Sequence, residues 1–453
     1  MGSLLLKNIR HLVTCDDEDR VLEGADLFIE DGVIRSIGKR AADRTADWTI
    51  DMSGMAVYPG LINTHHHLYQ ILTRNLPEVQ GLELFDWLTK LYSIWQHLTP
   101  DALHYASLAG MGELAKYGCT TVFDHHYVFP RASQELLPAE FAAADTLGMR
   151  MMVSRGSMDL SQKDGGLPPD AVVQSLDEIL KGSEDAVRKW HDPQPYAMRQ
   201  VALAPCSPFS VSEALLRESA LLARSLNVRL HTHLAETIDE ERYLMDKLGI
   251  RPLEYMERLG WVGPDVWFAH GIHFNDAELK RLSETGTGVA HCPASNMKLS
   301  SGVARIPEML KMKIPVGLAV DGSASNDGSS LAEEMRLAYL LHRLKSGKEA
   351  PSGYDVLKIA TRGSARLLGR DDLGQLKEGM AADLFAVNEN RLEFAGATFY
   401  VSGMLATVGL KGPVDYTIVN GKILVEKGEL QNLDEEVVSR KVRLYAEEMS
   451  NLS

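Results

Sequence analysis

The chain has 453 residues, of which 45% are hydrophobic, so it can bury a large core and we expect one large and one small domain. Its formal net charge of −15 argues against nucleic acid or an anionic membrane as a partner, because both require a basic face, and favours a small-molecule substrate. The apolar run at the N-terminus is too short for a signal peptide, and no segment approaches the ~20 apolar residues of a membrane span, so we expect a cytoplasmic protein.

Both ends of the chain have the pattern of short β-strands. Residues 3–6, 25–30 and 33–38 alternate apolar and polar side chains, and Asp31-Gly32 is typical of a hairpin turn. The segments 382–387 and 416–425 near the C-terminus have the same character. We therefore expect residues 1–58 and 378–430 to pair into one small β-domain, followed by a C-terminal helix over 431–453.

Between these ends, short apolar or β-branched runs alternate with helix-length segments, which is typical of an α/β protein with a parallel sheet. The predicted strands are 57–63, 120–124, 150–154, 201–204, 228–233, 266–270, 288–291 and 316–321. Eight such units predict a (β/α)8 barrel over residues 59–377, with its active site at the carboxyl ends of the strands. A doubly wound sheet is disfavoured because the sequence has no GxGxxG turn or P-loop.

Metal-ligating residue types occur at the ends of several predicted strands. His65 and His67 are two positions apart in an extended segment, so both side chains point to the same face. His233 ends the fifth strand and Asp321 ends the eighth. Three imidazoles and one carboxylate suit a divalent metal such as Zn²⁺ with one position left for water. The sequence therefore predicts one metal ion held by His65, His67, His233 and Asp321.

Two further residues have the chemistry that such a centre requires. A metal ion of this kind activates water to hydroxide, which requires a proton acceptor, and Glu236 lies three residues beyond His233. His270 ends the sixth strand and is expected either to ligate the metal or to hydrogen-bond the water or a developing oxyanion. We predict metal-assisted hydrolysis or hydrolytic deamination, with Glu236 and His270 as catalytic residues beside the metal ligands.

The end of the fourth strand reads Ala204-Pro205-Cys206-Ser207. Barrel hydrolases with two metals commonly carry a modified lysine at this position, so its absence favours a single metal. Cys206 is either a substrate contact or a buried inert thiol. The four cysteines are far apart and form no CxxC pair, so neither a disulfide framework nor a thiolate zinc site is indicated.

The segment 82–95, inserted between the first two strands, is rich in aromatic residues. It is expected either to lie over the mouth of the pocket, where Trp87 becomes a candidate substrate contact, or to pack on the barrel or on a second subunit.

Taken together, these motifs resemble the amidohydrolase superfamily, in the branch that contains cytosine deaminase-like enzymes, chlorohydrolases and guanine deaminases. The matching segments are 59–67, 231–237, 269–271, 293–299, 321–327 and 374–384. The resemblance implies that residues 65, 67, 233 and 321 bind one Zn or Fe ion, that residue 236 shuttles protons, and that residue 270 contacts the water or the substrate. It also implies a catalytic role for Asp321, in proton transfer after the water attacks. It also implies a β-sandwich formed by the chain ends and a homo-oligomer.

Within this branch, the segments 65–74, 85–88, 155–158 and 165–169 resemble those of deaminases that act on a free oxidised purine. This implies the conversion of 8-oxoguanine and water to uric acid and ammonia. Gln70 falls where guanine deaminases carry a glutamine that reads the purine edge, and an amide can donate and accept at once. Cys206 and Cys292 stand where relatives have histidine and asparagine.

Three alternatives follow from the same residues. Deamination of another ring, such as isoxanthopterin, guanine or isocytosine, would use the same metal site. The loop 322–327 is shared with triazine hydrolases, so release of chloride or an alkylthiol is a further alternative. A catalytically silent assembly protein would be expected to lack a ligand or Glu236, and the sequence retains all of them.

Overall fold

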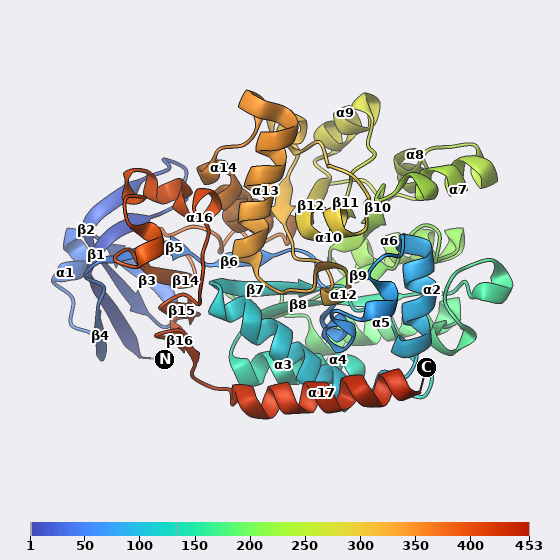
Figure 1. The fold of residues 1–453 in the computed structure, drawn as a ribbon, viewed down its shortest axis with the longest axis horizontal. Helices are drawn as coiled ribbons and strands as arrows, with labels where there is room; N and C mark the ends of the chain where they lie inside the picture. The colour runs from blue at the N-terminus through green and yellow to red at the C-terminus, as the bar shows by residue number, and fades with distance from the viewer. Residues whose placement is uncertain (1, 134, 453) are drawn as a thin grey trace.

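The computed structural model describes residues 2–133 and 135–452 and contains two separate sheets (Figure 1). Positions 1 and 453, which the sequence assigns to the terminal β-domain and the C-terminal helix, lie outside the described residues. One sheet is built from the two ends of the chain, and the other is an eight-stranded parallel sheet built from the middle. The fold is an α/β barrel with a separate terminal sheet, as the sequence predicts.

The terminal sheet has nine strands among the described residues. Its order is β17-β16-β15-β14-β5-β1-β2-β3, with β4 also paired to β1. Most neighbours are antiparallel, and β1 runs parallel to β4 and β5. The strands are β1 (Ser3–Val13), β2 (Val21–Glu30), β3 (Val33–Ile37), β4 (Trp48–Asp51), β5 (Met55–Pro59), β14 (Leu384–Asn388), β15 (Tyr416–Val419), β16 (Lys422–Glu426) and β17 (Glu429–Leu430).

The barrel strands follow one another in sequence order, each parallel to the next. They are β6 (Leu61–Asn63), β7 (Cys119–Asp124), β8 (Arg150–Ser157), β9 (Arg199–Pro205), β10 (Leu230–Leu234), β11 (Val266–His270), β12 (Gly288–His291) and β13 (Val316–Leu318). Just beyond β6, Thr64 donates through its main-chain N–H and its hydroxyl to the carbonyl of Leu318 in β13, at 3.2 and 3.0 Å. These bonds bring the first and last strands together and nearly close the barrel.

Helices surround the barrel and bury their apolar faces against it (Figure 1). Several of them begin with a side-chain cap; for example, the Ser212 hydroxyl accepts a hydrogen bond from the Leu215 N–H. The helices between and after the strands are α3 (Pro100–Lys116), α4 (Leu136–Leu147), α5 (Leu176–Trp190), α6 (Glu213–Ser225), α7 (Ile238–Leu248), α8 (Pro252–Arg258), α9 (Asp276–Thr285), α10 (Pro293–Lys298), α11 (Ile306–Lys311), α12 (Ser323–Asn326), α13 (Leu331–Ser346), α14 (Gly353–Lys358) and α15 (Ser364–Leu367).

The predicted strand 57–63 is divided at Gly60 between the two sheets. Its first half is β5 of the terminal sheet and its second half is β6 of the barrel. The Gly60 N–H donates to Asp383 of the terminal sheet, whereas the next N–H, that of Leu61, donates to Gly118 at the start of β7. A Cβ atom at Gly60 would lie 2.1 Å from the Thr120 hydroxyl oxygen, so only glycine fits at this junction.

Other strand ends differ from the sequence prediction by a few residues. β13 ends at Leu318, three residues before Asp321, and β10 covers Leu230–Leu234 rather than 228–233. Asp321 adopts a left-handed conformation with φ of 63°, which is incompatible with a continuing strand. The functional side chain therefore lies on the loop that follows the strand.

Two further helices complete the molecule: α2, which is called the lid below, and the C-terminal helix α17. Helix α2 (Leu84–Trp95) and the short turn η1 (Leu68–Thr73) form a buried cluster of aromatic and aliphatic side chains with residues at the carboxyl ends of β7 and β9. Helix α17 (Glu435–Asn451) runs along α3 and also contacts η1 and α2 (Figure 1). Within the described residues, no helix combines the length and apolar character needed to cross a bilayer.

Candidate metal centre and active site

The four predicted ligand residues meet at the carboxyl end of the barrel. The Asp321 Oδ1 atom lies 3.2 Å from His65 Nε2 and 3.3 Å from His67 Nε2. His67 Nε2 lies 3.2 Å from His233 Nε2. A tetrahedral ion with ligand distances of about 2.0–2.1 Å separates its ligand atoms by roughly 3.4 Å. The spacing of these atoms therefore fits a divalent metal ion.

The other ring nitrogens of these histidines are hydrogen-bonded in a way that leaves Nε2 available as a ligand. The Nδ1 atom of His67 donates to the carbonyl of His125 at 2.8 Å, and that of His233 donates to the carbonyl of Cys206 at 2.6 Å. Because a carbonyl can only accept, Nδ1 carries the proton and Nε2 carries the lone pair. Hydrogen bonds of this kind orient metal-binding imidazoles.

His65 is oriented through a second histidine. The His231 Nδ1 atom donates to the carbonyl of Trp267 at 2.9 Å, which leaves His231 Nε2 as an acceptor. That nitrogen lies 2.8 Å from His65 Nδ1, so His65 donates to it and presents an unprotonated Nε2 to the cluster. His65 Nε2 is buried and has no hydrogen-bond partner among the residues that the structure describes.

Burial keeps these ligands in the protonation states that metals bind. It lowers the pKa of His65 to about 3 and that of His233 well below its ordinary value. Burial opposes ionisation of Asp321, but its contacts with His65 and His67 outweigh this effect and hold its pKa well below the ordinary value. Neutral imidazoles and an ionised carboxylate are the forms that bind a metal ion.

Glu236 follows β10 and lines the same pocket as His233 and Asp321. Burial raises its pKa, although the nearby His270 offsets part of this effect. Its main chain is held by Glu240, whose carboxylate accepts hydrogen bonds from the N–H groups of Ala235 and Glu236, both at 3.0 Å. A buried carboxyl with a raised pKa is suited to take up and release a proton.

His270 is held beside Glu236 by a contact from the next βα unit. Its Nδ1 lies 2.9 Å from the side-chain oxygen of Asn296 in α10, so Nδ1 donates and Nε2 faces the pocket. His270 Nε2 is 3.5 Å from Glu236 Oε2 and 4.0 Å from Asp321 Oδ2. Burial opposes protonation of His270, but these two carboxylates outweigh it and raise the pKa. The ring can therefore act as a hydrogen-bond donor to a bound group.

The pocket above these residues is closed by α2. Leu84, Trp87 and Leu88 line it from the lid, together with Tyr127 and Phe209 from the barrel loops. Its volume in this conformation is about 30 Å³, the space of a single water molecule, whereas sites for small organic ligands usually measure ~300 Å³ or more. A ring-sized substrate therefore requires the pocket to widen. The insertion 82–95 lies over the pocket mouth, the first of the two positions considered from the sequence.

Gln70 and Trp87, two predicted substrate contacts, both line this pocket. The Gln70 side-chain oxygen accepts a long hydrogen bond of 3.4 Å from the Ala324 N–H. A Cβ atom at Gly322 would lie 1.9 Å from that oxygen, so the glycine allows Gln70 to approach the loop after β13. Trp87 is 3% exposed, and its indole N–H has no hydrogen-bond partner within residues 2–133 and 135–452.

Cys206 also lines the pocket, at the end of β9. Burial raises the pKa of its thiol to about 12, so it is a neutral, weakly polar group rather than a nucleophile. The thiol is therefore buried and unreactive, as one of the two interpretations from the sequence expects, and it lines the pocket.

The structure adds residues to the site that the sequence did not single out. Glu240 and Asn296 position Glu236 and His270 through contacts between separate loops, which no local motif indicates. A nitrogen of His125 lies within 4.8 Å of nitrogens of His65, His67 and His233, and its Nε2 donates to the carbonyl of Ala204. His125 directly follows β7, and this position at the carboxyl end of a barrel strand is the sequence signal that could have indicated it.

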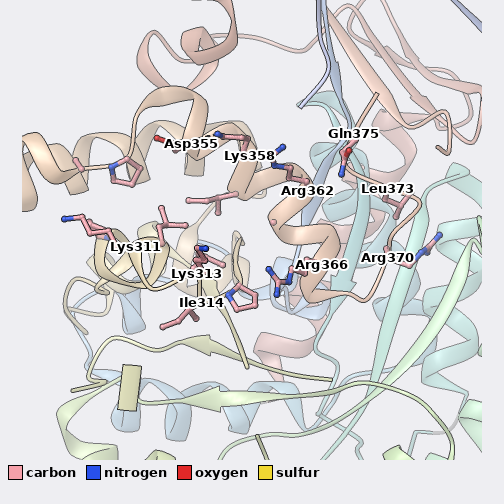
Figure 2. A pocket seen from close by; sticks show the side chains of 18 of the residues that line it. Lys311, Lys313, Ile314, Asp355, Lys358, Arg362, Arg366, Arg370, Leu373 and Gln375 are labelled. Atoms are coloured by element: carbon pink, nitrogen blue, oxygen red, sulfur yellow. Dashed lines mark ion pairs between the residues drawn. The ribbon is translucent and has the colours of Figure 1, made fainter. Parts of the chain in front are cut away.

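A much larger cavity, of about 990 Å³, lies away from this chemistry (Figure 2). It borders Val316 at the amino end of β13, whereas Asp321 follows the carboxyl end of that strand. Its lysines and arginines are largely paired; for example, Lys358 and Arg362 contact Asp19 at 3.3 and 3.2 Å. These pairs join the β1–β2 connection to the barrel. The cavity therefore lies at the end of the barrel opposite to the metal-ligand cluster.

Comparison with known proteins agrees with this arrangement. The model of the amidohydrolase family matches residues 56–424, which include His65, His67, His233 and Asp321. The chain belongs to the amidohydrolase family.

Among characterised amidohydrolases, the chain is 45% identical to an 8-oxoguanine deaminase from Pseudomonas aeruginosa, over 90% of this chain and 91% of that protein. It is 42% identical to a hydroxydechloroatrazine ethylaminohydrolase from Pseudomonas sp. (strain ADP), over 97% and 94%. The crystal structure of atrazine chlorohydrolase from Arthrobacter aurescens complexed with zinc has a TM-score of 0.93 and 33% identity, covering 98% of this chain and 100% of that chain. The chain is thus a hydrolase of ring substrates.

Proposed function

We propose that this amidohydrolase catalyses the hydrolytic deamination of a free oxidised purine, converting 8-oxoguanine and water to uric acid and ammonia, with one Zn²⁺ ion. The convergence of His65, His67, His233 and Asp321 beside Glu236 is the observation that carries the proposal. The relative named 8-oxoguanine deaminase, at 45% identity, supports the choice of ring.

A divalent ion at these ligands would supply a Lewis acid that lowers the pKa of a bound water from 15.7 to about 7. In the proposed reaction, Glu236 accepts a proton from the attacking water and transfers it to a ring nitrogen of the substrate. The water oxygen forms a bond to the carbon that bears the amine. His270 Nε2 donates a hydrogen bond to that oxygen, and Asp321 accepts its remaining proton.

Loss of the amine completes the proposed reaction. The carbon–nitrogen bond breaks, the proton held by Asp321 passes to the leaving nitrogen, and ammonia departs while the ring carbon becomes a carbonyl. The short distance between Asp321 Oδ2 and His270 Nε2, 4.0 Å, supports a role for both groups at the same reacting carbon.

Gln70 and Trp87 are proposed to recognise the ring. The Gln70 amide can donate and accept hydrogen bonds at once, which suits the adjacent carbonyl and N–H groups of a purine edge. Trp87 lines the pocket, and its buried indole N–H has no hydrogen-bond partner among the described residues. An oxidised purine, with its additional carbonyl group, can provide an acceptor.

Removal of an alkylamine from a triazine ring is the second candidate. It is favoured by the relative named hydroxydechloroatrazine ethylaminohydrolase, which matches 97% of the chain at 42% identity. Both reactions displace a nitrogen group from an electron-poor ring carbon, so the same metal site and Glu236 would serve either one.

The two candidates are separated by product analysis with the zinc-loaded protein. Ammonia release is measured with 8-oxoguanine, guanine, isoxanthopterin, isocytosine and cytosine, in parallel with ethylamine release from an ethylamino-hydroxytriazine and chloride release from a chlorotriazine. A kcat/KM for 8-oxoguanine at least 100-fold above every other ring supports the proposal. Ethylamine or chloride release with no ammonia from any purine overturns it in favour of a triazine.

A further inference from the structure

A second group of metal-ligating side chains lies behind the active site. Asp124 ends β7, His126 follows it two residues later, and Glu140 lies on α4. One ligand atom from each of these residues lies within 4.8 Å of the others. All three residues are completely buried, at 0% exposure.

These side chains are separated from the catalytic centre by the alternation of the extended chain. Asp124 and His126 point to one face, and the intervening His125 points to the other, where its ring centre lies 4.8 Å from that of His233. Asp124 Oδ1 accepts a hydrogen bond of 2.6 Å from the Leu68 N–H, one residue after the catalytic ligand His67. Through this hydrogen bond, the second group is attached to the loop that carries His65 and His67.

Five polar atoms of the group have no hydrogen-bond partner among the described residues. They are one oxygen of Asp124, both ring nitrogens of His126 and both oxygens of Glu140. An unsatisfied buried polar atom costs roughly 1–3 kcal/mol, and more when it is charged, so five in one place require an explanation. A ligand that contacts several of them at once would satisfy them together.

The candidate ligand atoms of the three residues lie close to one another, all within 4.8 Å. His126 Nδ1 and Glu140 Oε1 are 3.2 Å apart, but they are not aligned for a hydrogen bond. That separation is close to the roughly 3.4 Å between ligands of a tetrahedral ion. A small contraction around an ion would bring the Asp124 oxygen to a similar distance.

A cation would also balance the charges of the group. Burial raises the pKa of both Asp124 and Glu140, so the two carboxyls ionise together only with a cation beside them. No lysine or arginine forms an ion pair with either one within residues 2–133 and 135–452. The nearby Arg155 is engaged elsewhere, because it donates to Gly156 and Gln174 and stacks on the ring of Phe129. A divalent ion would neutralise both carboxylates.

We propose that Asp124, His126 and Glu140 bind a second, structural divalent transition-metal ion, Zn²⁺ or Mn²⁺, distinct from the catalytic ion. Two carboxylates and one imidazole are ligands that both metals accept. Because the site is fully buried, the ion enters during folding and exchanges slowly. Its role is to hold the end of β7 against α4 and, through Leu68, to support the loop of His65 and His67.

Metal analysis of purified full-length variants tests this proposal. The wild-type protein is expressed with excess ZnCl₂ or MnCl₂, desalted and analysed by plasma mass spectrometry, with the expectation of two ions per chain. Glu140→Gln and His67→Asn are each expected to retain one ion, from different sites, and the double variant none. Glu135→Gln, at the exposed start of the same helix, is the matched control and retains two.

The result that overturns the inference is a wild-type content of one ion that is lost in His67→Asn and kept in Glu140→Gln. That outcome leaves the proposed catalytic function intact and indicates that the buried carboxyls share a proton instead. If Glu140→Gln fails to fold by circular dichroism, His126→Gln replaces it in the same comparison. Retention of two ions by both variants also overturns the proposal.

Chelation provides a second measurement that does not depend on substitution. The catalytic ion, which borders the pocket, is expected to leave within minutes in 1,10-phenanthroline, whereas the buried ion leaves only when the protein unfolds. Metal release followed with a colorimetric indicator should therefore show one equivalent under native conditions and a second one after addition of guanidinium chloride. Release of only one equivalent in total contradicts the proposal.

Discussion

The carboxylate of Glu240 accepts a hydrogen bond of 3.0 Å from the main-chain N–H of Glu236. Its other oxygen accepts a hydrogen bond from Ala235, which has a left-handed φ of 54°. The first turn of α7 is thus tied to the turn that carries Glu236. This contact determines where the proposed proton shuttle lies relative to the metal ligands.

Replacing Glu240 with Ala should therefore displace Glu236 without removing a metal ligand. We expect kcat to fall by about 10- to 100-fold, the usual effect of losing a group that orients a catalytic residue, while metal content stays unchanged. Asp239→Ala, on the same turn but half-exposed, is the control and should retain kcat. An unchanged kcat in Glu240→Ala would show that Glu236 is positioned by other contacts.

Substituting Glu236 with Gln tests the proton shuttle itself. The amide keeps the size of the side chain but cannot accept the proton, so turnover should fall by roughly 10²- to 10⁴-fold while metal content remains at the wild-type level. Steady-state kinetics and metal analysis of the same preparation provide both values. A rate near that of the wild type would remove Glu236 from the mechanism.

The metal centre can be tested by ligand replacement and by chelation. His67→Asn should lower the content of catalytic metal and abolish activity, because one of the four ligand atoms is lost. His97→Asn, a partly buried histidine outside the cluster, is the control. Treatment of the wild type with a chelator should abolish activity, and added Zn²⁺ should restore it. Full activity without bound metal would refute the proposed chemistry.

The free energy of unfolding is expected to depend on pH because of Glu240. Burial raises its pKa from 4.5 to about 7 in the folded protein, so the folded state binds more protons than the unfolded state between these two values. The contribution of Glu240 to the free energy of unfolding is therefore present at low pH and is lost as pH rises through about 7. Urea unfolding between pH 5 and 8 should show a steeper decline for the wild type than for Glu240→Gln. Parallel profiles for the two proteins would contradict this assignment.

The lid provides a prediction about substrate binding. Trp87→Ala removes a buried side chain from α2 and from the wall of the pocket, so KM should rise by about 10-fold or more, with a smaller effect on kcat. Trp48→Ala changes an indole that is 72% exposed in the terminal sheet and serves as the control. An equal loss of kcat at unchanged KM would assign Trp87 to the chemical step instead.

Much of this molecule could be predicted without the structure, because the relevant signals are local. The alternation of short apolar runs with helix-length segments indicates βα units, and their number indicates a barrel. His65 and His67 lie on one face because they are two positions apart in an extended chain. Parallel strands bring their carboxyl ends to one rim, so residues as distant as His233 and Asp321 could be expected to meet there.

The remaining features depend on contacts between segments that are far apart in the sequence. Gly60 divides one apolar run between two sheets only because Thr120 and Asp383 pack against it. The link from His65 through His231 to Trp267 likewise joins three different barrel strands and their loops. Such contacts depend on side-chain packing between elements, and periodicity in a single segment carries no information about them.

The sequence by itself determined the barrel, the terminal sheet and the set of residues proposed for catalysis, since periodicity and strand ends are local properties. Only the tertiary structure decided that Glu240 orients Glu236, that α2 closes the pocket, and that Asp124 and Glu140 meet in the interior. Each of these depends on which helix packs over which strand end, and that arrangement exists only once the core has formed.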